Sequence, residues 1–271
     1  MSTSIESQVS PAYVDRKFYG PLALATGMPQ NIRRHMLAHP SDKTKMIREG
    51  HEGTYVDQAE MDERVFATQQ VLDGLTRHGV NHVNPAFIND TGMNNKPNLL
   101  TVVTLHENSI PYGNLLRKGL LSDEQVFEAD YVIGSMLEYL AEVIDEGGYV
   151  DAEMMRLKQF VYDDSQPQGK KMVLVDVEPL DGSKVDRNEE SVSDDGAPNQ
   201  MTRSVLRLVT DIINLCQKAG TRDITSLEKM ATIVASLPGE STAVNAMKAA
   251  ILRALDNRTV SAISRYSYYI Y

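Results

Sequence analysis

The chain has 271 residues, of which 42% are hydrophobic and 24% are charged, a composition typical of a folded protein with a packed core. Its formal net charge of −10 gives it no general attraction for nucleic acid or for anionic lipid, so we expect neither as a partner. A single cysteine, Cys216, excludes an intramolecular disulfide, and the lack of a secretory leader pattern and of a membrane-length apolar run favours a cytoplasmic protein.

The beginning of the chain combines irregular sequence with a glycine-containing segment. Prolines and glycines interrupt residues 1–44, which predicts an N-terminal extension with one short helix over 29–39. The segment 45–56 mixes β-branched residues with Gly50 and Gly53, a pattern typical of a small hairpin.

The following elements complete a small lobe. Apolar residues recur at helical spacing over 58–78, which predicts a helix. Strands are expected over 87–88 and 99–105, joined by a turn-rich loop. Together these elements predict a small β-rich lobe over 45–108.

The sequence from 109 to 260 is predicted to be mainly helical. Its clearest helix covers 123–146, where Ser122 is the N-cap and Gln125 completes a capping box. Strands are expected over 160–162 and 172–175, and an acidic polar loop over 181–200. Three further helices follow, over 202–219, 225–237 and 240–256.

Two carboxylates follow the strand expected at 172–175. If the strand continues, Asp176 and Glu178 point to the same side, because alternate side chains share a face. Neighbouring carboxylates repel each other unless a cation lies between them, so one interpretation is a metal or phosphate–metal site. The other is an acidic strand end that faces water, and both stay open at this point.

The stretch Arg156–Asp163, followed by Met172–Glu178, resembles the catalytic loop and the metal-binding segment of the protein kinase-like fold. The resemblance implies an α+β fold with a small β-rich N-terminal part and a larger, mainly helical C-terminal part. It also implies that Asp176 holds magnesium, that Gln159 is the second metal ligand and that Glu178 is an added ligand.

The resemblance extends to the small lobe. The segment from Gly50 through Gly53 to Val56 looks like a shortened glycine-rich loop over the phosphates of ATP. Glu63 corresponds to the glutamate that pairs with the phosphate-binding lysine. ATP and magnesium are therefore the cofactors that the resemblance implies.

The departures from the kinase pattern point to a pseudokinase. The catalytic aspartate is expected five residues before Gln159, where this chain has Met154. Glu153 and Asp151 are the only neighbouring carboxylates that could replace it, and only in a reshaped loop. The phosphate-binding lysine is also missing before Glu63. Phosphoryl transfer depends on positioning and electrostatics, so the chain is expected to be a pseudokinase or a weak nucleotide-binding scaffold.

A second interpretation belongs to another class of protein. Here the chain is a mostly helical structural or protein-interaction protein without enzymatic activity, and Asp176 is merely solvated. Its contact surface is the tyrosine-rich tail 261–271, which is unfavourable to leave in water. The sequence names neither the partner nor the oligomeric state.

Overall fold

The computed structural model divides the chain into two compact units, residues 1–66 with 83–107 and residues 67–82 with 108–271. The structure describes residues 36–38, 42, 44–49, 57–91, 97–104, 109–118, 121–177, 179, 184–185, 200–218 and 223–257.

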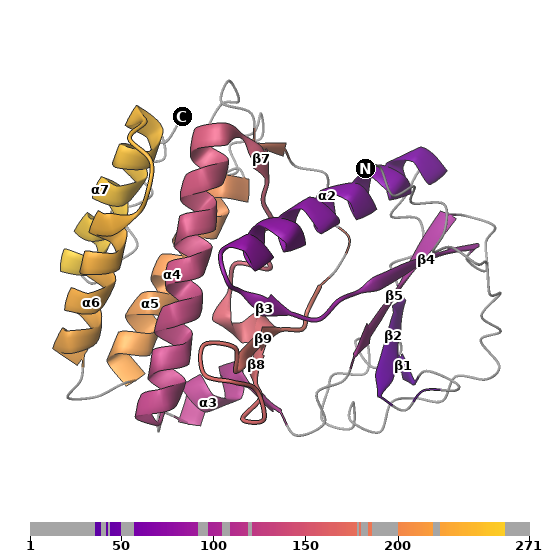
Figure 1. Cartoon of the computed structure of the whole chain (residues 1–271), viewed down its shortest axis with the longest axis horizontal. Coiled ribbons are helices and arrows are strands. Elements are labelled where there is room, and N and C mark those ends of the chain that lie inside the picture. The colour runs from indigo at the N-terminus through magenta and orange to yellow at the C-terminus, as the bar shows by residue number, and fades with distance from the viewer. Residues whose placement is uncertain are drawn as a thin grey trace. The chain divides into compact units, whose positions relative to one another are not determined.

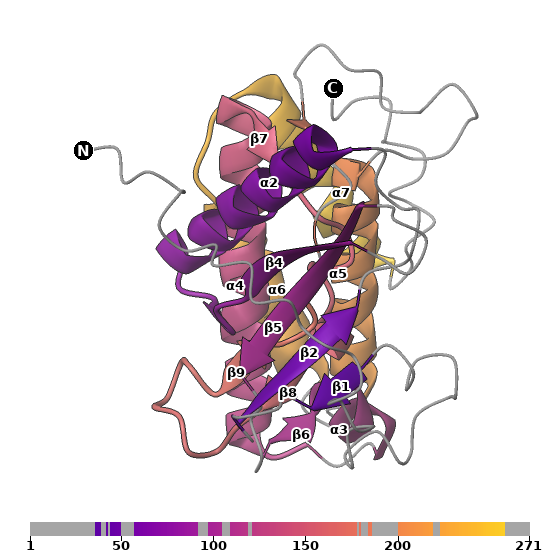
Figure 2. The same ribbon diagram turned by 90° about the vertical axis from the view of Figure 1, so that its right-hand side faces the viewer.

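The first unit contains an antiparallel four-stranded sheet (Figure 2). Its strands, in spatial order, are β1 (Met36–Ala38), β2 (Lys45–Glu49), β5 (Pro97–Thr104) and β4 (Ala86–Thr91). Both faces of β5 are buried, because Leu100 and Val102 cluster with Ile47 while Leu99 packs against Met61. Burial on both faces explains why this strand is an almost continuous apolar run.

Two expectations for this unit were wrong. The short helix expected over 29–39 is replaced, at residues 36–38, by strand β1. The hairpin expected within 45–56 is also not formed as predicted, because β2 pairs with β1 and with β5. A three-residue strand is stabilised by its partner strand, so its own sequence carries little signal. The segment 50–56 lies outside the described residues.

The second unit is mainly helical. Its long helices pack side by side (Figure 1), and they are α4 (Asp123–Glu146), α5 (Gln200–Lys218), α6 (Asp223–Ser236) and α7 (Thr242–Asp256). The predicted helix and capping box of α4 are confirmed, since Ser122 and Gln125 exchange both capping hydrogen bonds. None of the described helices is long and apolar enough to cross a membrane. The expected α+β class, with a small β-rich part and a larger helical part, is confirmed.

The remaining elements complete the second unit. The helix α2 (Gln58–Arg77) begins in the first unit and ends in the second, and α3 (Tyr112–Lys118) precedes α4. A sheet has the strand order β3 (Asn81–His82), β9 (Met172–Leu174), β8 (Phe160–Tyr162) and β6 (Ile110–Pro111). A separate ribbon pairs β7 (Gly148–Tyr149) with β10 (Lys184–Val185), so the loop expected over 181–200 contains a short strand.

An ion pair with a buried carboxylate, Asp130, and a partly exposed Lys229 lies between α4 and α6. Asp130 is 2% exposed, and its Oδ2 accepts a hydrogen bond of 2.7 Å from Lys229 Nζ, whereas its Oδ1 is buried without a partner among the described residues. Burial raises the pKa of Asp130 above the ordinary 3.8, although the bond to Lys229 opposes this shift. The charged carboxylate is therefore costly at this position.

This raised pKa predicts a pH-dependent stability. Folding favours the protonated form of Asp130, so its contribution is complete below the ordinary pKa and is lost as the pH rises through the raised value. Asp130→Asn cannot titrate. We expect the unfolding free energy of the wild type minus that of Asp130→Asn to be smaller near about pH 7 than near about pH 4. Urea denaturation at both pH values measures this difference, and a constant or increasing difference contradicts the prediction.

Candidate functional site

The candidate site is built on the loop 151–159, which leads from β7 to strand β8. Asp151 shapes its first turn, because its Oδ1 accepts a hydrogen bond of 2.7 Å from the backbone N–H of Glu153. A 3-10 turn over Leu157–Gln159 then leads directly into β8. Such an aspartate-capped turn fixes the backbone locally and engages one oxygen of the Asp151 carboxylate.

A buried carboxylate anchors the middle of this loop. The backbone N–H of Leu157 donates a 2.7 Å hydrogen bond to Oδ2 of Asp211, a residue of helix α5 that is 8% exposed. Burial raises the pKa of Asp211, and the hydrogen bond from Leu157 and the charges of nearby basic residues oppose this shift. The loop is thus attached to α5 by its backbone, through Asp211, which was not among the predicted site residues.

Glu153, one of the two predicted substitute bases, is surrounded by positive charge. Arg207 of α5 forms an ion pair with its Oε1, while Oε2 lies 3.8 Å from Arg156 and 3.7 Å from Lys158. Both oxygens of the Glu153 carboxylate therefore face cations of this chain. The side chain of Glu153 is 52% exposed, so these contacts occur at the surface.

The position that the kinase resemblance aligns with the catalytic aspartate is buried. Met154 is 1% exposed and Met155 is fully buried, so both side chains belong to the core. Their burial fixes the loop from its inner side. The prediction of Glu153 or Asp151 as a substitute base stays a prediction.

The two predicted metal ligands, Gln159 and Asp176, are brought together by the backbone. The carbonyl oxygen of Gln159 accepts hydrogen bonds from the N–H groups of Val175, at 3.1 Å, and of Asp176, at 3.4 Å. The side chain of Gln159 is 9% exposed, and its Nε2 lies 3.5 Å from Oε2 of Glu153. Asp176 is partly exposed. Metal binding by these residues stays a prediction.

The strand that was expected to place Asp176 and Glu178 on one face is shorter than predicted. Strand β9 ends at Leu174, before either carboxylate. Two successive N–H groups then bond the same carbonyl of Gln159, whereas successive N–H groups in a strand point to opposite sides. The chain bends at this point, and Glu178 itself lies outside the described residues.

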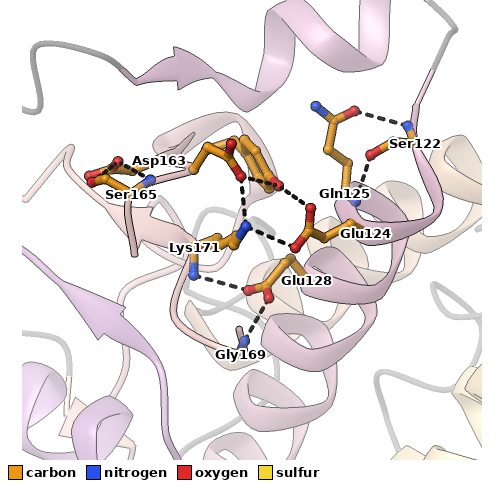
Figure 3. A network of polar contacts seen from close by, with 10 residues as sticks. Ser122, Glu124, Gln125, Glu128, Asp163, Ser165, Gly169 and Lys171 are labelled. Carbon is orange, nitrogen blue, oxygen red and sulfur yellow. Dashed lines mark hydrogen bonds and ion pairs between the residues drawn. The ribbon is translucent and has the colours of Figure 1, made fainter. Parts of the chain in front are cut away.

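A polar network holds the hairpin that carries both predicted ligands (Figure 3). Glu128 of α4 is fully buried, and its two carboxylate oxygens accept the N–H groups of Gly169, at 2.6 Å, and of Lys171, at 3.0 Å. Gly169 has a φ of +78°, which favours glycine in this turn. Nζ of Lys171 bonds Glu124 at 2.8 Å and Asp164 at 2.6 Å, which raises its pKa above the ordinary range. The β8–β9 turn is thereby attached to α4.

The other predicted site residues lie in the first unit or outside the described residues, so their roles stay predictions. Glu63 is exposed on α2 and belongs to the first unit, whereas the loop belongs to the second. Gly50 and Gly53, like the tail 261–271, lie outside the described residues. Among the residues that the structure describes, no group of three or more histidine, cysteine or acidic side chains could hold a metal ion.

Comparisons with known proteins give structural neighbours only. No protein-family model and no curated protein matches the chain. It is similar to the structure of WaaP in complex with acyl carrier protein, with 11% identity and a TM-score of 0.44 over 84% of this chain and 80% of that one. It is also similar to the PAN3 pseudokinase of Neurospora crassa, with 11% identity and a TM-score of 0.44 over 96% of this chain. The Drosophila melanogaster PAN3 pseudokinase matches 86% of this chain at 12% identity, with a TM-score of 0.36.

The chain spans 67% of the Neurospora PAN3 chain and 59% of the Drosophila one. The resemblance to the protein kinase-like fold that the sequence suggested is thus found again among structural neighbours, two of which are pseudokinases. Because each of these TM-scores is below 0.5, we base the function on the residues of this chain and not on its neighbours.

Proposed function

We propose that this chain is a kinase-like domain that does not transfer phosphate and that works as a protein-binding scaffold with weak nucleotide affinity. The proposal is carried by one observation, namely that the three candidate residues of the loop 151–159 are buried or already engaged in other contacts. Met154 is buried, Asp151 caps the turn with one oxygen, and Glu153 is bound by three cations. A general base needs an acceptor atom that is free to contact the substrate hydroxyl. Met154 offers none at the surface, Asp151 uses one oxygen in the turn, and both oxygens of Glu153 face cations.

Gln159 and Asp176 support the nucleotide part of the proposal. Magnesium in nucleotide sites is commonly held by one or two protein oxygen ligands together with water and phosphate oxygens. One side-chain amide and one carboxylate, adjacent through their backbone, fit that requirement. Gln159 and Asp176 would hold the magnesium ion, and the ion would neutralise part of the charge on the nucleotide phosphates.

Phosphate transfer and nucleotide binding are tested together. With ATP, magnesium and a general protein acceptor, we expect no phosphate transfer above background. Transfer that is abolished by Glu153→Gln or by Asp151→Asn would overturn the proposal.

Nucleotide binding is measured by the melting temperature. A ligand at about 100 times its dissociation constant raises the free energy of unfolding by roughly 2.7 kcal/mol, so ATP with magnesium should raise the melting temperature by about 5–10 °C. We expect Asp176→Asn to remove this rise and Asp256→Asn, an exposed carboxylate on α7, to keep it. Equal shifts in both variants contradict the assignment of Asp176.

A second candidate function is a helical interaction protein that binds no nucleotide. Phe127 and Tyr131 lie one turn apart on α4 and are 39% and 40% exposed. Exposed aromatic side chains at helical spacing are common in protein-binding surfaces. A melting temperature that ATP and magnesium leave unchanged favours this candidate, and loss of partner binding in Phe127→Ala supports it directly.

A further inference from the structure

Three cations of the second unit meet at one exposed carboxylate. Arg156 and Lys158 belong to the loop 151–159, and Arg207 belongs to α5. We call these three residues the loop cation cluster. All three form ion pairs with Glu153, in a chain whose net charge is −10. Such a concentration of positive charge is unexpected on an acidic protein and indicates affinity for an anion.

The carboxylate of Glu153 is too small to satisfy this cluster. Arg207 contacts Oε1 closely, whereas Arg156 and Lys158 lie 3.8 Å and 3.7 Å from Oε2. Charged N–H···O hydrogen bonds are about 2.7–2.9 Å long, so the two loop cations attract Glu153 without a hydrogen bond to it. An oxyanion with three acceptor oxygens could reach all three cations at once.

The cluster is also preorganised. Leu157, which separates Arg156 from Lys158, is fully buried, and its N–H is bonded to Asp211. This attachment holds the residues on either side of Leu157 next to α5, where Arg207 lies one turn before Asp211. Little loop ordering is then required when an anion binds, which favours affinity.

The charge balance allows a doubly charged ligand. Within 4 Å, Glu153 supplies one negative charge against three positive charges. The Asp211 carboxylate beneath the loop interacts with the same three cations, which favour its ionised form, whereas its burial opposes that form. Arg203 lies one turn before Arg207 on α5 and makes no ion pair with any residue in the described ranges. A phosphate monoester carries about −1.5 to −2 charges near neutral pH and three acceptor oxygens, which matches this excess.

We propose that the loop cation cluster binds a phosphate monoester on a protein partner, and that the carboxylate of Glu153 occupies this site until the phosphate displaces it. The side chains of Glu153, Arg156, Lys158 and Arg207 are 52%, 31%, 48% and 27% exposed. A phosphorylated side chain can therefore reach them from solvent. This inference rests on the proposed scaffold function, for which it names the chemistry of the partner.

The test is a titration with an otherwise uncharged peptide that carries one phosphoserine, in the absence of nucleotide. Glu153→Gln removes the competing charge, so we expect it to bind the phosphopeptide about tenfold more tightly than the wild type does. We expect Arg207→Gln and Arg156→Gln to weaken binding about tenfold each, also in the Glu153→Gln background. Arg117→Gln, which changes an exposed arginine of α3, is the matched control and should bind as the wild type does.

Three results overturn the inference. The first is that Glu153→Gln binds the phosphopeptide no more tightly than the wild type does. The second is that both arginine variants bind it as tightly as their parent does. The third is that the unphosphorylated peptide binds as tightly as the phosphopeptide. Inorganic phosphate and ATP are titrated in parallel, and binding of either one without binding of the phosphopeptide overturns the assignment to a protein partner. Phosphate transfer is measured separately, so an active chain that binds the phosphopeptide contradicts the proposed function alone. An inactive chain that fails to bind contradicts the inference alone.

Discussion

Replacement of Glu128 by alanine is expected to lower the free energy of unfolding by about 2–4 kcal/mol. The carboxylate is fully buried and accepts two backbone N–H groups of the β8–β9 turn, from Gly169 and Lys171. Its removal leaves both donors without their acceptor and opens a cavity beside α4. An unsatisfied buried donor costs more than its hydrogen bond contributes, so the two losses together account for this magnitude.

The neighbouring Glu124 provides the matched control. It lies one turn earlier on α4, also contacts the hairpin through Lys171, and its side chain is 46% exposed. Because an exposed ion pair contributes less than about 1 kcal/mol, Glu124→Ala should be nearly as stable as the wild type. Urea denaturation of both variants measures the difference. If the two substitutions lower the free energy of unfolding by the same amount, Glu128 does not hold the turn in the way that we describe.

The same turn connects stability to the candidate site. Gln159 precedes β8 and Asp176 follows β9, so the hairpin between them determines their separation. If the hairpin loses its attachment to α4, Gln159 and Asp176 should no longer be held close together. The sequence indicated the hairpin but not this attachment.

The parts of the fold that the sequence predicted are those in which local pattern and final structure agree. Helix α4 was predicted with its observed bounds, because apolar residues recur at helical spacing and Ser122 and Gln125 cap it. The strands β8 and β9 were predicted because short apolar runs flank a polar turn. In contrast, the two-residue strands of the second unit exist only through pairing with distant segments, which one sequence does not reveal.

The site residues that were not predicted from the sequence are buried carboxylic acids. Asp211 stands among Leu208, Ile212 and Leu215 on the apolar stripe of α5, so a carboxylate occupies a core position there. Glu128 likewise lies one turn before Val132, which is buried. A charged residue on the buried face of an amphipathic helix is the signal that could have identified both. Their partners are backbone N–H groups, and these carry no sequence signature.

Replacement of Asp211 by alanine is expected to lower the free energy of unfolding by about 1.5–3 kcal/mol and to release the loop 151–159 from α5. Asp211 is the acceptor for the N–H of Leu157, and both residues are buried. Asp211→Asn keeps one carbonyl oxygen that can accept the same bond, so this variant should retain the loop and most of the stability. Thr210→Ala, at an exposed neighbouring position of α5, should change neither property by more than about 0.5 kcal/mol.

Hydrogen exchange distinguishes loosening of this loop from general destabilisation. In the wild type, the amide of Leu157 should exchange slowly, because a buried hydrogen bond must open first. In Asp211→Ala it should exchange faster by a larger factor than the amides in the centre of α4, which respond only to global stability. Equal acceleration at both places would contradict the anchoring role. Because the loop cation cluster depends on the same attachment, Asp211→Ala should also weaken phosphopeptide binding, while Asp211→Asn should preserve it.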